Sequence, residues 1–303
     1  MTVLGIIAAF GGGIFGAAIG ALPAFEMVGF LVMIGVAVQL GVAPEATDFF
    51  GLPFGAFGPH VGGFASGVAA AAYAARRGKF DSGKNILAGM MGLKAPDVLL
   101  VGGAFGIFGY IVQYYLALVP AFGEGLAWTD TVALTVVVSA IVTRLMFGKA
   151  GLFGTPKEGT TRWNPGEADR WLPFQSTLGQ LVVIGLGVGI FGGYLGDLYG
   201  GAGCFLAFGI SAASLIFLQF GVSVPVTHHI ALPAALAAAG SGSLLWAGVV
   251  GVIAALLGEF FARLFHDHGD THFDPPATTI ATMTLTVNYL LSIGFFSLVP
   301  LPY

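Results

Sequence analysis

The sequence predicts an all-α polytopic membrane protein of about ten transmembrane helices, arranged as two five-helix inverted repeats. Of its 303 residues, 56% are hydrophobic and only 9% are charged, whereas a soluble domain has about 25% charged residues because its surface faces water. The apolar residues come in long runs, such as Leu245 to Leu257, and not in the alternation of a membrane β-barrel. A resemblance between the two halves of the chain indicates the repeat.

Ten segments have the length and apolarity of membrane spans, since about 20 apolar residues cross a bilayer. They are residues 3–22, 25–41, 55–75, 95–118, 131–147, 178–198, 203–221, 225–240, 244–265 and 277–299. The polar stretch from Thr155 to Pro173 divides them near the middle of the chain. We therefore expect a first repeat in residues 1–150, a cytoplasmic linker in 151–177 and a second repeat in 178–303.

The basic residues indicate how these spans are oriented. All 11 Lys and Arg residues fall on one side, after the third and fifth spans and at the end of the ninth. The loops on the other side contain Glu45, Asp48, Glu124 and Asp130 but no Lys or Arg. Basic loops stay in the cytoplasm, so we expect a multi-pass protein of the plasma (inner) membrane with both termini outside.

The two halves share a glycine-rich motif. Residues 11–22 read GGGIFGAAIGAL and residues 187–198 read GVGIFGGYLGDL, and Gln39-Leu40-Gly41 corresponds to Gln219-Phe220-Gly221. Because each half has an odd number of spans, the second copy must enter the membrane upside down, as in many secondary transporters. Glycines at four-residue intervals in both copies predict close helix packing. Chance similarity between glycine-rich helices is the alternative.

Histidines stand at two predicted breaks in the helices, near His60 and near His228. The helix from His228 to Ala239 is about 18 Å long at 1.5 Å per residue, shorter than a hydrocarbon core of about 30 Å. It therefore begins inside the bilayer, and the Gly- and Pro-rich stretch from Phe49 to Pro59 predicts a similar non-helical entry before His60. Two helix N-termini pointing inward would favour an anion or a polar acceptor. Alternatively, these histidines only stabilise the packing.

Intramembrane polar residues are candidates for solute contact, because they are costly to bury. We assign substrate binding to six of them: His60, His228, His229, Thr227, Asn288 and Asp97. Asp97 after Pro96 is also typical of a helix start, which gives it a structural alternative. Glu259 and Arg263 are four residues apart, a spacing that predicts an intrahelical ion pair.

A polar cluster between the last two spans contains potential metal ligands. These are His266, His268, Asp270, His272 and Asp274, whose side chains suit Zn²⁺ or a similar divalent ion. The spacing matches no established zinc motif, since H-E-x-x-H is absent. The alternative is a polar cytoplasmic loop, outside the hydrocarbon and dispensable for folding. Cys204 stands alone, so no cysteine-based metal site or disulfide is expected.

These features together predict a transporter or channel for a small polar or anionic solute, with its pathway at the interface of the repeats. Imidazole titrates near neutral pH, so proton coupling is chemically available. The alternatives are a divalent-metal transporter or integral-membrane metalloprotein using the 266–274 loop, and a structural subunit of a membrane complex. The sequence has no Walker A motif, no G-x-S-x-G motif and no basic nucleic-acid surface. We therefore expect the lipid bilayer, a small molecule or ion, and further copies of the chain as partners, and transport rather than enzymatic activity.

Overall fold

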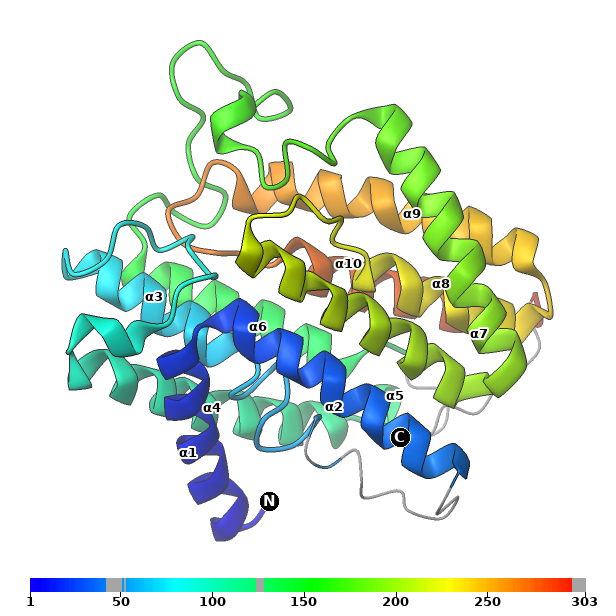
Figure 1. The fold of residues 1–303 in the computed structure, drawn as a ribbon, viewed down its shortest axis with the longest axis horizontal. Helices are drawn as coiled ribbons and strands as arrows, with labels where there is room; N and C mark the ends of the chain where they lie inside the picture. The colour runs from blue at the N-terminus through cyan, green and yellow to red at the C-terminus, as the bar shows by residue number, and fades with distance from the viewer. Residues whose placement is uncertain (42–50, 52, 124–127, 296–303) are drawn as a thin grey trace.

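The computed structural model describes residues 1–41, 51, 53–123 and 128–295, and these residues form helices and connecting turns without a β-strand (Figure 1). The predicted all-α class is therefore confirmed for this part of the chain. The α-helices are α1 Val3–Ile19, α2 Ala21–Gly41, α3 Ala65–Arg76, α4 Pro96–Ala117, α5 Pro120–Gly123, α6 Thr131–Phe147, α7 Leu178–Ala213, α8 His228–Ser241, α9 Leu244–Phe261 and α10 Pro275–Ser292.

Four helical segments in the described ranges are long and apolar enough to cross a membrane. They are Ala21–Gly41, Pro96–Ala117, Leu178–Phe220 and Leu244–His266. The first of these is α2 and the second is α4, whereas the third joins α7 to a following 3-10 segment. The fourth joins α9 to a π-helical turn. Helices α1 and α6 are apolar but shorter. Residues 53–64 form turns and no helix, which confirms the predicted non-helical stretch over 53–59, whereas the predicted span 55–75 is helical only from Ala65. The end of the predicted last span lies outside the described residues.

Helix α7 contains the predicted span 178–198 and the first part of the predicted span 203–221, whose remainder is the 3-10 segment Ser214–Phe220. Its backbone leaves the helical region at Gly200, where φ is 57° and ψ is −134°, and in Figure 1 the chain reverses direction there. A Cβ atom added at Gly203 would overlap the backbone oxygen of Leu195, so the two parts of α7 touch just beyond the bend. In the first half Gly20, with φ 106°, separates α1 from α2 in the same way.

Glycines produce matching packing in the two halves. In α1, Gly13 lies against Gly102 of α4. In the first part of α7, Gly189 lies against Gly251 of α9. The glycine one turn further along α1 faces residues 56–62, and the corresponding glycine of α7 faces α8. Both of these elements lie at a predicted break in the helices. A side chain at these glycines would meet backbone atoms, so the predicted close packing is confirmed.

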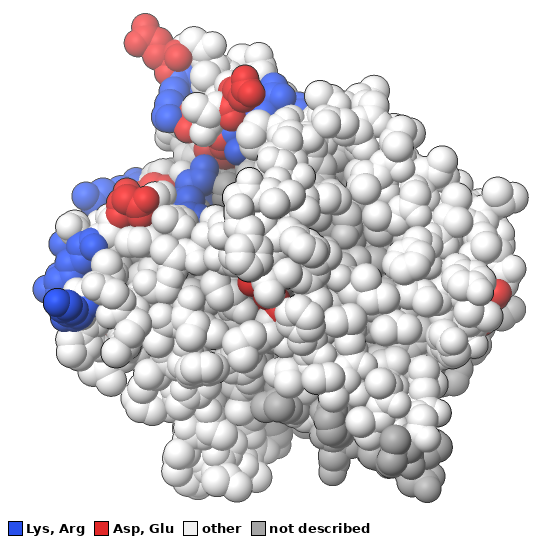
Figure 2. All heavy atoms as spheres, in the orientation of Figure 1, with Lys and Arg blue, Asp and Glu red and all other residues white. Residues whose placement is uncertain are grey.

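Helix α8 lies at the centre of the molecule. Twelve of its 14 residues are buried, and most of them are alanine or leucine. It packs on α7, α9 and α10, while α2 packs on α7 and α6 packs on α10 to join the two halves. Figure 2 shows Lys and Arg gathered at one end of the visible face, where the linker lies, and a broad uncharged surface over the helices. The fold thus places the Lys and Arg of this face at one end and its interior around α8.

Candidate functional site

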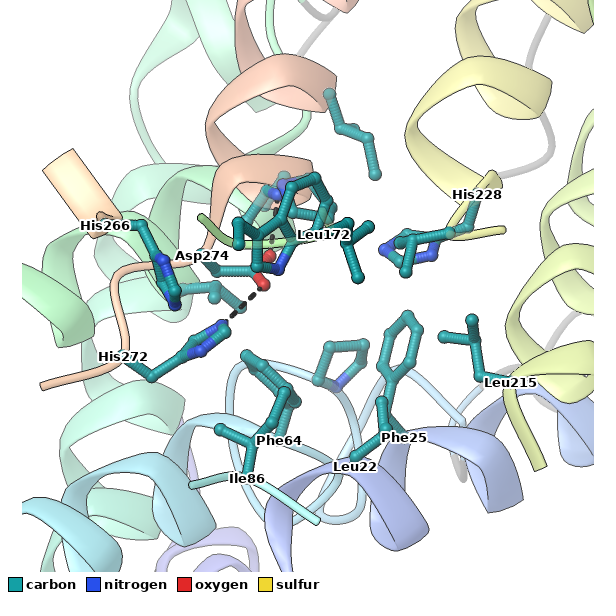
Figure 3. A pocket seen from close by; sticks show the side chains of 18 of the residues that line it. Leu22, Phe25, Phe64, Ile86, Leu172, Leu215, His228, His266, His272 and Asp274 are labelled. Carbon is teal, nitrogen blue, oxygen red and sulfur yellow. Dashed lines mark hydrogen bonds and ion pairs between the residues drawn. The ribbon is translucent and has the colours of Figure 1, made fainter. Parts of the chain in front are cut away.

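A cavity of about 410 Å³ lies between the two halves (Figure 3). Its walls come from α2, α6, α8, α10, the second part of α7 with the 3-10 segment that follows it, and non-helical segments that include residues 54–64, 84–87, 170–174 and 272–274. Aromatic and aliphatic side chains make up most of the lining, as in ligand-binding pockets generally. The charged and histidine side chains that line it are Lys84, Asp130, Asp169, Arg170, His228, His266, His272 and Asp274.

Two helices, one from each half, begin beside this cavity. The residue before α3 is Phe64 and the residue before α8 is Thr227, and neither start has a side-chain capping hydrogen bond. Phe25 of α2 contacts both starts, with its ring centroid 5.8 Å from that of Phe64 and 4.7 Å from that of His228. Free backbone N–H groups at a helix start attract anions and polar acceptors. At α3 the Ala65 and Ser66 N–H groups already donate to the backbone oxygens of Pro59 and Val61, so the start of α8 is the one that presents such groups to the cavity.

Gln175 fixes the entry of the chain into α8. Its side-chain amide donates to the backbone oxygen of Val226 at 3.1 Å and accepts from the Val226 N–H at 2.9 Å. Both Gln175 and Val226 are buried, so the Gln175 amide satisfies the backbone N–H and C=O groups of Val226 as a neighbouring strand would. The linker thereby positions the first residues of α8.

His228 is the first residue of α8 and extends into the cavity (Figure 3). It is 5% exposed, and its Nδ1 has no hydrogen-bond partner among the described residues. The rings of Phe25 and Phe208 surround the imidazole, with Phe208 at 5.8 Å between centroids. A buried polar atom without a partner costs folding free energy, and this atom could instead bind a solute in the cavity.

Most of the segment 266–274 is buried, so the expectation of an exposed polar loop is wrong. His266, His268 and His272 are all buried, because a guanidinium and a neighbouring loop provide hydrogen-bond partners for the segment. Arg144 of α6 donates to the Thr271 Oγ1 at 2.8 Å and to the Thr271 backbone oxygen at 2.6 Å. The His272 N–H donates to the Gly83 backbone oxygen at 3.0 Å.

His272 and Asp274 form the polar side of the cavity opposite His228 (Figure 3). His272 Nε2 lies 3.1 Å from Asp274 Oδ1, and its ring centroid is 4.9 Å from that of His266. Asp274 Oδ2 accepts from the Ala277 N–H at 2.7 Å, which caps the start of α10. Like that of His228, the Nδ1 of His272 has no partner among the described residues.

The five predicted metal ligands do not converge on one point. His266, His272 and Asp274 line the cavity, whereas His268 contacts the backbone oxygen of Arg162 and Asp270 accepts from the Lys149 N–H. Within the described ranges no three His, Cys, Asp or Glu side chains are arranged to hold a metal ion.

The remaining predicted solute-binding residues lie away from the cavity lining. His60 is buried beside Gly109 of α4, and His229 is buried against Gly258 of α9. Thr227 precedes α8, and Asn288 is buried in α10.

Asp97 lies in the first turn of α4 and pairs with Arg77 at 3.3 Å and Lys79 at 3.4 Å. The predicted pair of Glu259 and Arg263 is present at 2.8 Å and is confirmed.

Sequence analysis missed two cations of the cavity, Lys84 and Arg170. The Lys84 ammonium donates to the Asp267 backbone oxygen at 3.2 Å. Burial lowers the pKa of Lys84, although the Asp267 carboxylate opposes this shift, and burial raises the pKa of Asp267. Arg170 belongs to the linker, where the apolar residues 171–174 that follow it were the signal of a contact with the cavity.

Comparison with known proteins gives one result. A family model described as a family of unknown function (DUF7973) matches residues 1–169 and 164–301. No curated protein and no solved structure matches the chain. The two matched segments meet inside the predicted linker.

Proposed function

We propose that this protein is a membrane transporter or channel for a small polar or anionic solute. The chain belongs to the family of unknown function DUF7973. The solute pathway passes through the cavity between the two halves. Four helices long enough to span a membrane support the location in a bilayer. The exposed apolar surface supports it too, since side chains such as Leu245 (82% exposed) and Leu4 (76% exposed) would face water in a soluble protein.

We further propose ten spans in two inverted five-helix repeats, residues 1–150 and 178–303, joined by the linker 151–177. The matched packing of α1 on α4 and of α7 on α9 supports this arrangement. So do the bends at Gly20 and Gly200, which are 180 residues apart, the same separation as between Gln39 and Gln219. An inverted repeat places a binding site near the middle of the membrane, where half-helices begin.

The single observation that carries the proposal is the start of α8 at the cavity. There His228 combines a buried ring nitrogen without a partner with the free N–H groups of a helix start. Such groups can replace the water that a polar or anionic solute loses on entering the membrane. His228 therefore binds the solute in this proposal, and His272 binds it from the opposite side.

The neighbouring histidines provide a matched test of this role. We expect His228→Ala to abolish solute flux and to lower thermal stability less than His229→Ala does, because the His228 ring borders the cavity. His229→Ala should lower thermal stability and retain flux, because His229 fills space beside Gly258 and does not line the cavity. Flux is measured in proteoliposomes with glycerol, acetate, lactate and phosphate. Flux equal to that of empty liposomes for the unsubstituted protein, or retained in His228→Ala, would contradict the proposal.

Divalent-metal transport and a metalloprotein have less support than solute transport. Only two of the three histidines in the 266–274 segment line the cavity, and His268 contacts a backbone oxygen outside it. A structural subunit would not require a cavity of this size between its two halves.

A further inference from the structure

We infer that the cavity binds an organic anion, a carboxylate or similar acid group attached to an apolar body, rather than an inorganic ion. This inference rests on the proposed function and names its substrate class. It is drawn from the size of the cavity, the chemistry of its walls, and the hydrogen bonds of its charged side chains.

The size of the cavity fits an organic molecule. At about 410 Å³ it falls within the range of sites for drug-sized ligands, about 300–1,000 Å³. A water molecule occupies about 30 Å³ in the liquid, so a bare or partly hydrated inorganic ion would leave much of this space unfilled. Ion filters use close rings of oxygens to replace the hydration shell, and the lining of this cavity has no such ring among the described residues.

The walls also favour an apolar body. Six phenylalanines line the cavity, among them Phe25 of α2, Phe208 of α7 and Phe64 before α3. Leu22 and Leu215 lie on the same side as Phe25 (Figure 3). Aromatic rings offer large apolar contact areas, and water in contact with them is easily displaced by a ligand carbon skeleton. A solute that was polar throughout would leave these faces without a matching partner.

The carboxylates of the cavity already have protein partners. Asp274 accepts from the Ala277 N–H at 2.7 Å and contacts His272 at 3.1 Å. Asp130 accepts from the Ala133 N–H at 2.8 Å, and Asp169 pairs with Lys157 at 2.6 Å. These acids therefore cap helices or bind a cation of the protein.

In the part of the chain that the structure describes, the cations of the cavity donate hydrogen bonds only to uncharged groups, while the Asp267 and Asp169 carboxylates interact with Lys84 at longer range. The Lys84 ammonium donates to a backbone oxygen, and Arg170 donates to Ser176 Oγ at 3.0 Å and to Asn164 Oδ1 at 3.2 Å. Among the described residues no carboxylate oxygen lies within 4.0 Å of either cation. The Arg170 Nε is buried without any partner. Together with the unpartnered His228 Nδ1, these groups select a negatively charged ligand.

Trp171 lines the cavity next to Arg170 and provides a probe of binding. In a variant that keeps only this tryptophan (Trp128, Trp163 and Trp246 each changed to Phe), its emission is measured in nanodiscs. The titrants are sodium phenylacetate, phenylacetamide and sodium acetate. We expect phenylacetate to bind at least about tenfold more tightly than its neutral amide and than acetate, because a hydrogen bond to a charged group exceeds a neutral one by about this factor. This comparison uses one protein and depends on no cavity variant.

Two substitutions test the cations directly. Lys84→Gln and Arg170→Gln should each weaken phenylacetate binding about tenfold and leave phenylacetamide binding unchanged, whereas Arg77→Gln, at an exposed ion pair, should change neither. Equal affinity for the amide and the carboxylate would overturn the anionic class. Equal affinity for acetate and phenylacetate would overturn the apolar body. If only the inferred substrate class is wrong, the protein still transports a solute in proteoliposomes. Absence of both binding and flux would contradict the proposed function itself.

Discussion

Replacement of Arg144 with Met removes the guanidinium that fixes the 266–274 segment in the interior. Arg144 is 1% exposed and donates to four oxygens. Two belong to Thr271, and the others are the backbone oxygens of Leu152 at 2.9 Å and Phe265 at 2.5 Å. Met fills part of the space but donates no hydrogen bond, so these oxygens remain buried without their donor.

The magnitude of this loss follows from the number of stranded oxygens. A buried acceptor without its donor costs about 1–3 kcal/mol, and removal of one member of a buried charged network typically costs about 3–5 kcal/mol. Arg144→Met also removes the desolvation penalty of the buried guanidinium, which offsets part of the cost of the four unpaired oxygens. We therefore expect Arg144→Met to lower the free energy of unfolding by about 4 kcal/mol. At about 2–4 °C for each kcal/mol, the thermal midpoint should fall by about 10 °C.

Thermal unfolding in detergent, followed by tryptophan emission, measures this effect. Arg77→Met is the matched control, since the Arg77 side chain is 50% exposed and its ion pair with Asp97 lies at the surface. Surface pairs contribute about 0–1 kcal/mol, so the control should shift the midpoint by no more than about 3 °C. Equal midpoints for the two variants would refute the role given to Arg144.

Three further predictions concern packing, the buried segment and orientation. Gly16→Ala should destabilise the protein by about 1–3 kcal/mol because its Cβ would overlap facing backbone, whereas Gly11→Ala, with open space around it, should be neutral in the same unfolding assay. His272→Ala should lower the free energy of unfolding by about 2 kcal/mol or more because the ring is 2% exposed. An unchanged thermal midpoint would indicate that the 266–274 segment is dispensable for folding. The single natural cysteine is buried, so on intact cells an impermeant thiol reagent should label Val3→Cys and spare Glu158→Cys, and the reverse pattern would invert the topology.

The helices could be predicted from sequence because they depend on local properties. The apolar runs at 131–147 and 95–118 gave α6 and α4 to within one residue, since the length of an apolar run and a Pro at its start determine such helices. The break near Gly200 and the start of α8 could also be predicted, because a Gly or Pro interrupts the apolar run at each of these positions.

The cavity could be predicted only in part, because its polar side depends on distant partners. The composition of residues 266–274 indicates an exposed loop, and nothing nearby in sequence reveals that Arg144, 127 residues before Thr271, fixes them inside. In the same way the linker reads as polar, although its end contributes Arg170 and Trp171 to the cavity. His60 and His228 occupy similar sequence contexts, and only the packing of α4 over His60 distinguishes them.

The contact of Arg144 with the second half also bears on the evolutionary history of the chain. A duplicated ancestor would have paired two identical copies, each complete in itself. Here the guanidinium of the first half ties down residues Phe265 and Thr271 of the second, so neither half contains all the partners of its own buried polar groups. A gene divided within the linker would therefore yield two fragments that fold only when made together, because each supplies hydrogen-bond partners that the other lacks.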